Sequence, residues 1–152
     1  MRALFAKRLH RYLAETPAAR LLTADIGYGV LDSIRSEHRA QCVDFGAAEQ
    51  LMIGAACGMA LSGLKPICYS ITPFLLYRPF EWIRNFLNHD RIPVKLVGVG
   101  RGRNYGNLGF THWAEDELDA ITCFRNISMF TEVSEWEGFL QCRGPAYLNL
   151  RK

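Results

Sequence analysis

The segment Asp44-Phe45-Gly46-Ala47-Ala48-Glu49-Gln50-Leu51-Met52-Ile53-Gly54 predicts a β-strand that turns directly into an α-helix. Residues 41–45 alternate in polarity, Gly46 permits a tight turn, and residues 47–61 are rich in Ala, Met and Leu. Glu49 falls in the first turn of this helix. Its carboxylate either complements the positive end of the helix dipole, a stabilisation of about 0.3–1 kcal/mol, or has a functional role. These residues alone leave both interpretations open.

The rest of the chain shows the same alternation of strand and helix patterns. Basic and apolar residues alternate at helical spacing over residues 2–13, which predicts an amphipathic helix with a solvated basic face. The apolar run at residues 93–99 is typical of a strand buried on both faces of a parallel sheet. Gly63 is a C-cap signal for the central helix, and Ser134 is the expected N-cap of the last helix. Further strands are predicted at residues 18–23, 41–45, 66–71, 127–133 and 146–150, and further helices at residues 30–38, 47–61, 73–88, 114–123 and 134–141.

This alternation predicts the fold class, which is α/β with a doubly wound, six-stranded, mostly parallel sheet and helices on both faces. A length of 152 residues suits one domain, covering residues 1–152. In such sheets, ligands bind outside the carboxyl ends of the strands. The candidate residues that follow predicted strand ends are Asp25, Glu49, Phe74, His112 and the glycine-rich loop of residues 100–109. The sequence therefore predicts one site at one edge of the domain.

Composition excludes several classes of function. A net charge of +3 is too small to indicate a nucleic acid or a membrane surface as partner, and the apolar runs are too short to span a membrane. Five cysteines without a C-x-x-C pair argue against a zinc or redox motif and suggest reduced thiols and a cytoplasmic location. The G-x-G at Gly100–Gly102 lacks the third glycine and the downstream acid of a dinucleotide-binding fingerprint.

Six segments in order resemble the central region of transketolase-like thiamine diphosphate enzymes: GAAEQ, LSGLKP, YSITPFL, PVKLVGVG, YGNLGFTHWAED and GPAYLNL. The resemblance covers residues 21–152. It implies the pyrimidine-binding domain of that family, with thiamine diphosphate as the cofactor.

The resemblance also implies roles for individual residues. Glu49 matches the glutamate that contacts N1′ of the aminopyrimidine, and Phe74 and Tyr77 match the aromatic wall around that ring. Asp25 matches an acid near the thiazolium across a subunit boundary. His112 matches a histidine that contacts substrate oxygens and transfers protons, for which its reference pKa near 6.5 is suitable. From spacing alone, most aromatic pairs of this kind belong to the core, and a lone histidine is more often structural.

Two positions depart from the transketolase pattern near His112. The family has an acid that reads a sugar hydroxyl where this chain has Leu108, and a proline where it has Phe110. These departures argue against sugar-phosphate specificity of the pentose pathway type. Arg101 and Arg103 flank Gly102 in the preceding loop and are a candidate grip for an anionic substrate, because Arg presents fixed bidentate donors. The alternative is an exposed loop with two solvated charges.

The family's diphosphate and Mg²⁺ ligands lie in a separate domain with a G-D-G pattern, which this sequence does not contain. The expectation is therefore that this chain lacks the pyrophosphate-binding and C-terminal domains, and that a partner subunit with a G-D-G motif supplies the Mg²⁺ ligands. Small residues at 54–60 predict self-association through the central helix, giving a heterotetramer with two sites.

The sequence therefore indicates a subunit of a split transketolase-like enzyme that transfers a two-carbon ketol unit, with a small-molecule or carrier-bound substrate. One alternative is a non-catalytic assembly or regulatory subunit derived from such a domain. A metabolite-binding module without chemistry is a third possibility.

Overall fold

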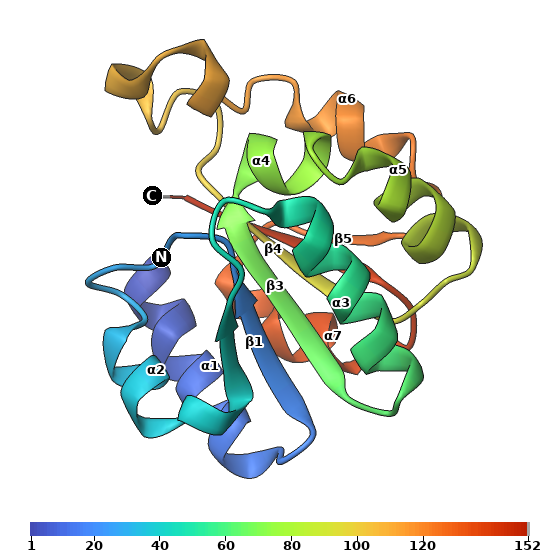
Figure 1. Cartoon of the computed structure of the whole chain (residues 1–152). Coiled ribbons are helices and arrows are strands. Elements are labelled where there is room, and N and C mark those ends of the chain that lie inside the picture. Colours follow the sequence, from blue (N-terminus) through green and yellow to red (C-terminus); the bar gives the residue numbers. More distant parts are fainter. Residues whose placement is uncertain (152) are drawn as a thin grey trace.

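A computed structural model describes residues 1–151, which form three layers with a parallel sheet between two layers of helices (Figure 1). The strand order is β2-β1-β3-β4-β6-β5, and every pair of neighbouring strands is parallel. The predicted fold class is confirmed, with an all-parallel sheet in place of a mostly parallel one. The strands are β1 (Ala19–Thr23), β2 (Cys42–Asp44), β3 (Lys65–Ile71), β4 (Lys95–Val99), β5 (Ser128–Phe130) and β6 (Ala146–Leu150).

The connections between the strands are helical, with short 3₁₀ turns where the chain changes direction. The α-helices are α1 (Arg2–Glu15), α2 (Asp32–Glu37), α3 (Glu49–Leu61), α4 (Thr72–Tyr77), α5 (Phe80–Trp82), α6 (Glu117–Thr122) and α7 (Trp136–Gln141), and a π-helical segment η2 (Ile83–His89) follows α5. The 3₁₀ turns are η1 (Arg39–Gln41), η3 (Gly106–Leu108), η4 (Phe110–His112) and η5 (Val133–Glu135).

Each face of the sheet has its own hydrophobic core. Alternation along β3 sends Ile67 and Tyr69 into the core beneath α1, α2 and α7, and Cys68 into the core beneath α3, α4, η2 and α6. Helix α1 buries Phe5 and Leu9, one helical turn apart, against the first of these cores, as the amphipathic pattern predicts. The strand is therefore buried on both faces, which is why a helical layer covers each side of the sheet.

The predicted helix 73–88 is wrong as one continuous element. Helix α4 ends at Tyr77, and Pro79 separates it from α5 and η2. Proline has no N–H to donate and its ring clashes with the carbonyl four residues earlier, so an α-helix does not continue through it. Because of this break, α4 is a short helix that directly follows β3.

The structure agrees with one of three predicted helix ends and differs at the other two. Gly63 adopts φ = 85° and closes α3 as expected, with its N–H bonded to the Ala60 carbonyl at 3.1 Å. Ser134 is not the cap of the last helical segment, because Glu132 caps η5 through a reciprocal capping box with Glu135. The helix predicted at residues 114–123 is shorter, because α6 begins only at Glu117.

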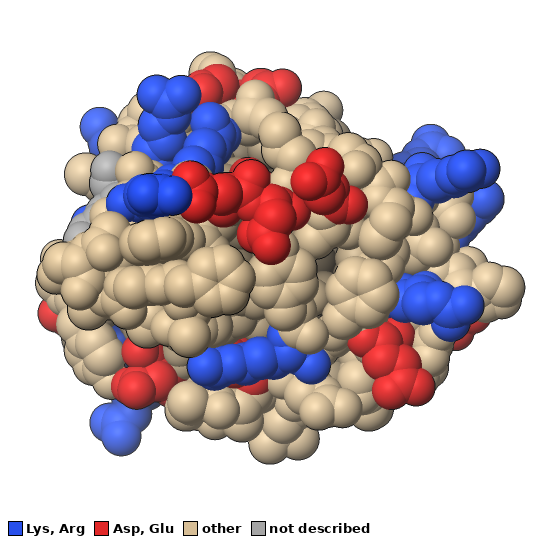
Figure 2. Space-filling view, turned by 90° about the horizontal axis from the view of Figure 1, so that it is seen from above, with Lys and Arg blue, Asp and Glu red and all other residues tan. Residues whose placement is uncertain are grey.

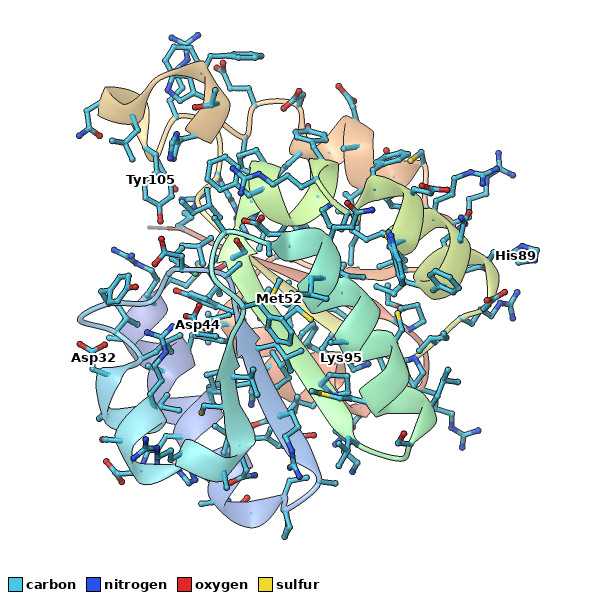
Figure 3. All side chains as sticks on the ribbon, viewed as in Figure 1. Asp32, Asp44, Met52, His89, Lys95 and Tyr105 are labelled. Atoms are coloured by element: carbon cyan, nitrogen blue, oxygen red, sulfur yellow. The ribbon has the colours of Figure 1, made fainter. Side chains whose placement is uncertain are left out.

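Parallel strands place all their carboxyl ends at one edge of the sheet, where the loops after β1, β2, β3 and β4 meet (Figure 1). In Figure 3, Asp44 lies at the end of β2 and Tyr105 on the loop after β4, whereas Lys95 lies at the start of β4. The predicted site residues follow the strands at the Asp44 and Tyr105 edge.

Candidate functional site

Glu49 is a buried acid at the carboxyl edge of the sheet. It is the first residue of α3, after a turn in which Gly46 adopts φ = 64°, and its side chain is 1% exposed. Ser70 of β3 donates to one carboxylate oxygen at 3.3 Å, and Arg78 donates to the other at 2.7 Å. A buried carboxylate needs such donors to offset its lost hydration. This environment differs from that of a surface charge that only complements a helix dipole.

Arg78 connects Glu49 to the ring of Phe74. The guanidinium carbon lies 3.8 Å from the Phe74 ring centroid, and the arginine side chain is 43% exposed. Phe74 and Arg78 are four residues apart on and just after α4, the spacing that brings helical side chains together. Sequence reasoning missed Arg78. The signal available was the need of a buried acid for a cation, together with this four-residue spacing.

His112 completes the group from the loop after β4. Its ring packs edge-on against Phe74 with 4.8 Å between centroids, and Tyr105 lies 6.3 Å away on the same loop. The Thr111 hydroxyl lies 3.0 Å from Nδ1 of His112. The structure therefore brings together Glu49, Phe74 and His112, which the sequence placed at one edge.

Tyr77 is turned toward the start of α6. Burial, together with a hydrogen bond to Asp116, raises the pKa of the Tyr77 phenol above its ordinary value. The side chain remains 40% exposed. The two aromatics of the predicted wall thus have different neighbours: Phe74 contacts Arg78 and His112, and Tyr77 contacts Asp116.

An open pocket lies beside Glu49. Its volume is about 550 Å³, within the usual range for small-molecule sites. The short side chains of Ala47 and Ala48 form part of its wall, as do Glu49 and Arg78. Figure 2 looks onto this edge, where acidic side chains gather toward the middle and basic side chains flank them.

Asp25 lies in a neighbouring cluster at the end of β1. It is exposed with φ = 47°, accepts a 2.6 Å hydrogen bond from the Tyr28 hydroxyl, and donates its N–H to Asp44 at 3.2 Å. Arg35 also pairs with Asp44 at 3.0 Å. Although partial burial opposes the shift, hydrogen bonds from Thr23, Gly46 and Asp25, together with the charge of Arg35, hold the pKa of the Asp44 carboxyl below its usual value. Within residues 1–151, the contacts of Asp25 do not join it to Glu49.

Arg101 and Arg103 have different environments. The Arg101 guanidinium donates to the side chain and carbonyl of Asn149 at 3.0 and 2.9 Å and to the Thr131 carbonyl, and it lies 3.6 Å from Glu132. In this conformation, the Arg101 guanidinium is bonded to other residues of the chain and is not directed at an external anion. Arg103 is more exposed.

Trp113 and Glu115 are the neighbours of the Arg103 guanidinium. Its central carbon lies 4.3 Å from the Trp113 ring centroid, and it pairs with Glu115 at 2.9 Å. Its side chain is 62% exposed. Of the two predicted anion ligands, Arg103 is therefore the more accessible.

A buried polar network behind the site was not predicted from the sequence. The Asn149 side-chain nitrogen lies within hydrogen-bond distance of Glu117 at 2.5 Å, of the Tyr147 hydroxyl at 2.8 Å and of the Thr72 hydroxyl at 3.3 Å. Burial raises the pKa of the Glu117 carboxyl to about 7, although Arg101 and the Asn149 hydrogen bond oppose the shift. An asparagine within the apolar strand AYLNL was the only local signal for it.

Comparison with known proteins agrees with this geometry. Residues 1–136 match the family model of the transketolase pyrimidine-binding domain, and the chain belongs to this family. It is 33% identical over 118 residues to a subunit of apulose-4-phosphate transketolase from Actinobacillus succinogenes, covering 71% of this chain and 37% of that protein. It is 31% identical over 132 residues to 1-deoxy-D-xylulose-5-phosphate synthase of Dechloromonas aromatica, covering 87% and 20% respectively. The chain thus spans less than two fifths of the length of these relatives.

Solved structures share the fold at lower identity. A split-gene transketolase described as an inactive β4 tetramer superposes with a TM-score of 0.83 at 23% identity, covering 97% of this chain and 50% of the other. Transketolase from Leishmania mexicana superposes with a TM-score of 0.86 at 19% identity, covering 99% and 25%. Among residues 1–151, no helix is long and apolar enough to cross a membrane, and no group of three or more His, Cys, Asp or Glu side chains is arranged to hold a metal ion.

Proposed function

We propose that this chain supplies the aminopyrimidine-binding half of a thiamine diphosphate site in a transketolase-type enzyme. The observation that carries the proposal is the buried Glu49 carboxylate, whose partner Arg78 also lies over the ring of Phe74. An aminopyrimidine needs a carboxylate acceptor, a flat apolar surface and space to enter. All three are present at this edge of the sheet.

The occupancy of this site by Arg78 supports the fit. A flat cationic group with N–H donors already lies 2.7 Å from the Glu49 oxygen and 3.8 Å above the Phe74 ring. A protonated aminopyrimidine has the same flatness, charge and donors. When bound, thiamine diphosphate supplies a carbon nucleophile whose formation depends on the protonation state of its aminopyrimidine.

Two residues of this chain have proposed roles in proton control. Glu49 holds a proton at N1′ of the pyrimidine, and its burial strengthens that interaction because water does not compete for the carboxylate. His112, whose ring packs against Phe74, exchanges protons with substrate oxygens. Asp25 is proposed to face the thiazolium of a second subunit's site.

The proposed reaction is transfer of a two-carbon ketol unit between small-molecule or carrier-bound substrates. The names of the relatives, a transketolase subunit and a deoxyxylulose phosphate synthase, support chemistry of this class. Leu108 and Phe110 are 50% and 79% exposed near His112, so the loop presents apolar side chains rather than a sugar-reading acid. This surface favours acceptors other than those of the pentose pathway.

The proposal includes a partner polypeptide with the G-D-G motif and the Mg²⁺ ligands, joined in a cytoplasmic heterotetramer. It is supported by relatives described as a transketolase subunit and as the product of a split gene. The outer face of α3 gives a surface for self-association, since Leu51 is 64% exposed there. Gly54 contributes less to that surface than its sequence suggests. A Cβ atom at Gly54 would lie 2.9 Å from Trp82 of the same chain, so this glycine serves internal packing.

The alternative is a non-catalytic assembly subunit of the same family. The two hypotheses differ in their dependence on Glu49. In the reconstituted complex, Glu49→Gln should reduce turnover by about 10²–10⁴-fold, the range for a lost catalytic polar contact, while circular dichroism shows a preserved fold. The matched control is Glu81→Gln, which alters an exposed acid of α5. Activity of Glu49→Gln within about threefold of wild type would support the assembly role instead.

A further inference from the structure

Arg78 occupies the two contacts that the proposed function assigns to the cofactor ring. Its guanidinium donates to the Glu49 carboxylate at 2.7 Å and lies 3.8 Å above the Phe74 ring. Its side chain is 43% exposed, whereas that of Glu49 is 1% exposed. The arginine therefore closes the buried acid from the solvent side.

The guanidinium and a pyrimidine ring cannot both hold this position. A planar group stacked on an aromatic ring sits about 3.5–4 Å from it, which leaves no room for a second planar group between the two. The Arg78 contact also uses the Glu49 oxygen opposite the one that Ser70 binds. A ring that stacks on Phe74 and donates to Glu49 must therefore displace the guanidinium.

We propose that Arg78 is a built-in substitute for the aminopyrimidine, which keeps the site closed in the free chain and leaves Glu49 when the ring binds. This inference rests on the proposed function. An exchange of one flat cation for another keeps the buried carboxylate paired before and after binding, which avoids the penalty of an unpaired buried charge. The position of Arg78 makes the exchange possible, because it lies at the exposed end of α4, where Pro79 ends the helix.

The closed state lowers the apparent affinity of the chain for the ring. If the open form is a minor fraction of the population, the apparent dissociation constant rises by the inverse of that fraction. Removing the guanidinium should therefore increase affinity. A residue that merely supports the site would have the opposite effect.

The test uses the isolated ring, 4-amino-5-hydroxymethyl-2-methylpyrimidine, because it needs neither Mg²⁺ nor diphosphate ligands. Titration of the full chain should show Arg78→Ala binding this probe about tenfold more tightly than wild type, which corresponds to an open fraction of about one tenth. Arg84→Ala, which removes an exposed arginine of η2, should leave the affinity unchanged. Equal or weaker binding by Arg78→Ala would overturn the inference.

A second measurement does not depend on the stability of that variant. In ¹⁵N spectra of the wild-type chain, the Nε–H resonance of Arg78 is assigned by its loss in Arg78→Lys. Saturation with the probe should move this resonance to the position of a solvated arginine, and an unmoved resonance would overturn the inference.

Glu49→Gln separates this inference from the proposed function. Probe binding that is lost in Glu49→Gln but not improved in Arg78→Ala rejects the substitute role and keeps the pyrimidine site. Failure of wild type, Arg78→Ala and Glu49→Gln alike to bind the probe rejects both. Tighter binding in Arg78→Ala that is lost when Glu49→Gln is added supports both.

Discussion

The carboxylate of Glu117 accepts a 2.5 Å hydrogen bond from the side-chain amide of Asn149, although the two residues are 32 positions apart. Glu117 begins α6 and Asn149 lies in β6, and both are buried, with 6% and 1% of their surface exposed. This pair connects the segment that follows the His112 loop to β6, which lies between β4 and β5 in the sheet.

The raised pKa of Glu117 predicts a pH-dependent stability. Its folded-state pKa of about 7 lies above the ordinary value of 4.5, so the folded protein binds more protons than the unfolded chain between these two values. The free energy of unfolding should therefore fall as the pH rises from about 4.5 to 7. One pKa unit corresponds to about 1.4 kcal/mol, so the loss is of the order of 3 kcal/mol at most.

Urea unfolding of wild type and Glu117→Gln at pH 5 and pH 8 checks this expectation. The difference in unfolding free energy between the two proteins should shift in favour of Glu117→Gln at the higher pH. Parallel pH curves for the two proteins would mean that Glu117 does not titrate in this range.

Gly98 lies where a side chain would break the same network. A Cβ atom there would be 2.7 Å from the Tyr147 hydroxyl and 2.8 Å from the Thr72 hydroxyl. Gly98→Ala should therefore destabilise the fold by about 1–3 kcal/mol through overpacking, as measured by urea unfolding.

Gly58 is the matched control for Gly98. It lies in α3, and apart from the neighbouring residues and backbone of that helix, a Cβ atom at this position would meet nothing within 4 Å. Gly58→Ala should stabilise the chain by roughly 0.5–1 kcal/mol, because alanine restricts the unfolded state and suits a helix. Similar destabilisation by both substitutions would show that steric space around Gly98 is not the cause.

Substitution of Arg101 and of Arg103 should have different effects on stability, because Arg101 is bonded within the fold and Arg103 is exposed. Arg101→Ala removes donors to Asn149 and Thr131 and should lower the free energy of unfolding by about 1–3 kcal/mol. Arg103→Ala alters a side chain that is 62% exposed and should change stability by less than about 0.5 kcal/mol.

Enzyme kinetics of the reconstituted complex then test the anion-binding prediction. If Arg103 holds an anionic substrate, Arg103→Ala should raise KM for that substrate at unchanged cofactor affinity. An unchanged KM would assign Arg103 to the protein surface, in contact with Trp113 and Glu115 alone.

We expect the chain to self-associate through helix α3. Leu51 is 64% exposed on its outer face, and a charge placed in an apolar interface must be desolvated without a partner. Leu51→Arg should therefore lower the molar mass of the complex from that of a heterotetramer to that of a heterodimer in light scattering. Leu4→Arg is the control, because Leu4 is 48% exposed on α1, in the opposite helical layer. A full-size assembly of Leu51→Arg would place the interface elsewhere.

Much of the fold was predictable because the pattern of buried apolar residues within each element is set by residues close together in the sequence. The apolar run of β4, which is buried throughout, and the 3.6-residue period of α1 can be recognised from neighbouring residues, and so can the turn at Gly46 and the cap at Gly63. Local signals were weaker at helix boundaries. Pro79 divided a segment whose apolar pattern continued, since a missing N–H does not change hydrophobic periodicity.

The sequence by itself determined that strands alternate with helices, and hence that Glu49, Phe74 and His112 follow strands at one edge. Only the tertiary structure decided which distant side chains contact Glu49 and the loop that carries His112. Arg78 reaches Glu49 across 29 positions, and Arg101 reaches Asn149 across 48. Such pairs depend on the strand order, which places β6 between β4 and β5, and on the degree of burial at each contact. Neither quantity is a property of a short stretch of sequence, because both arise only when distant segments pack together.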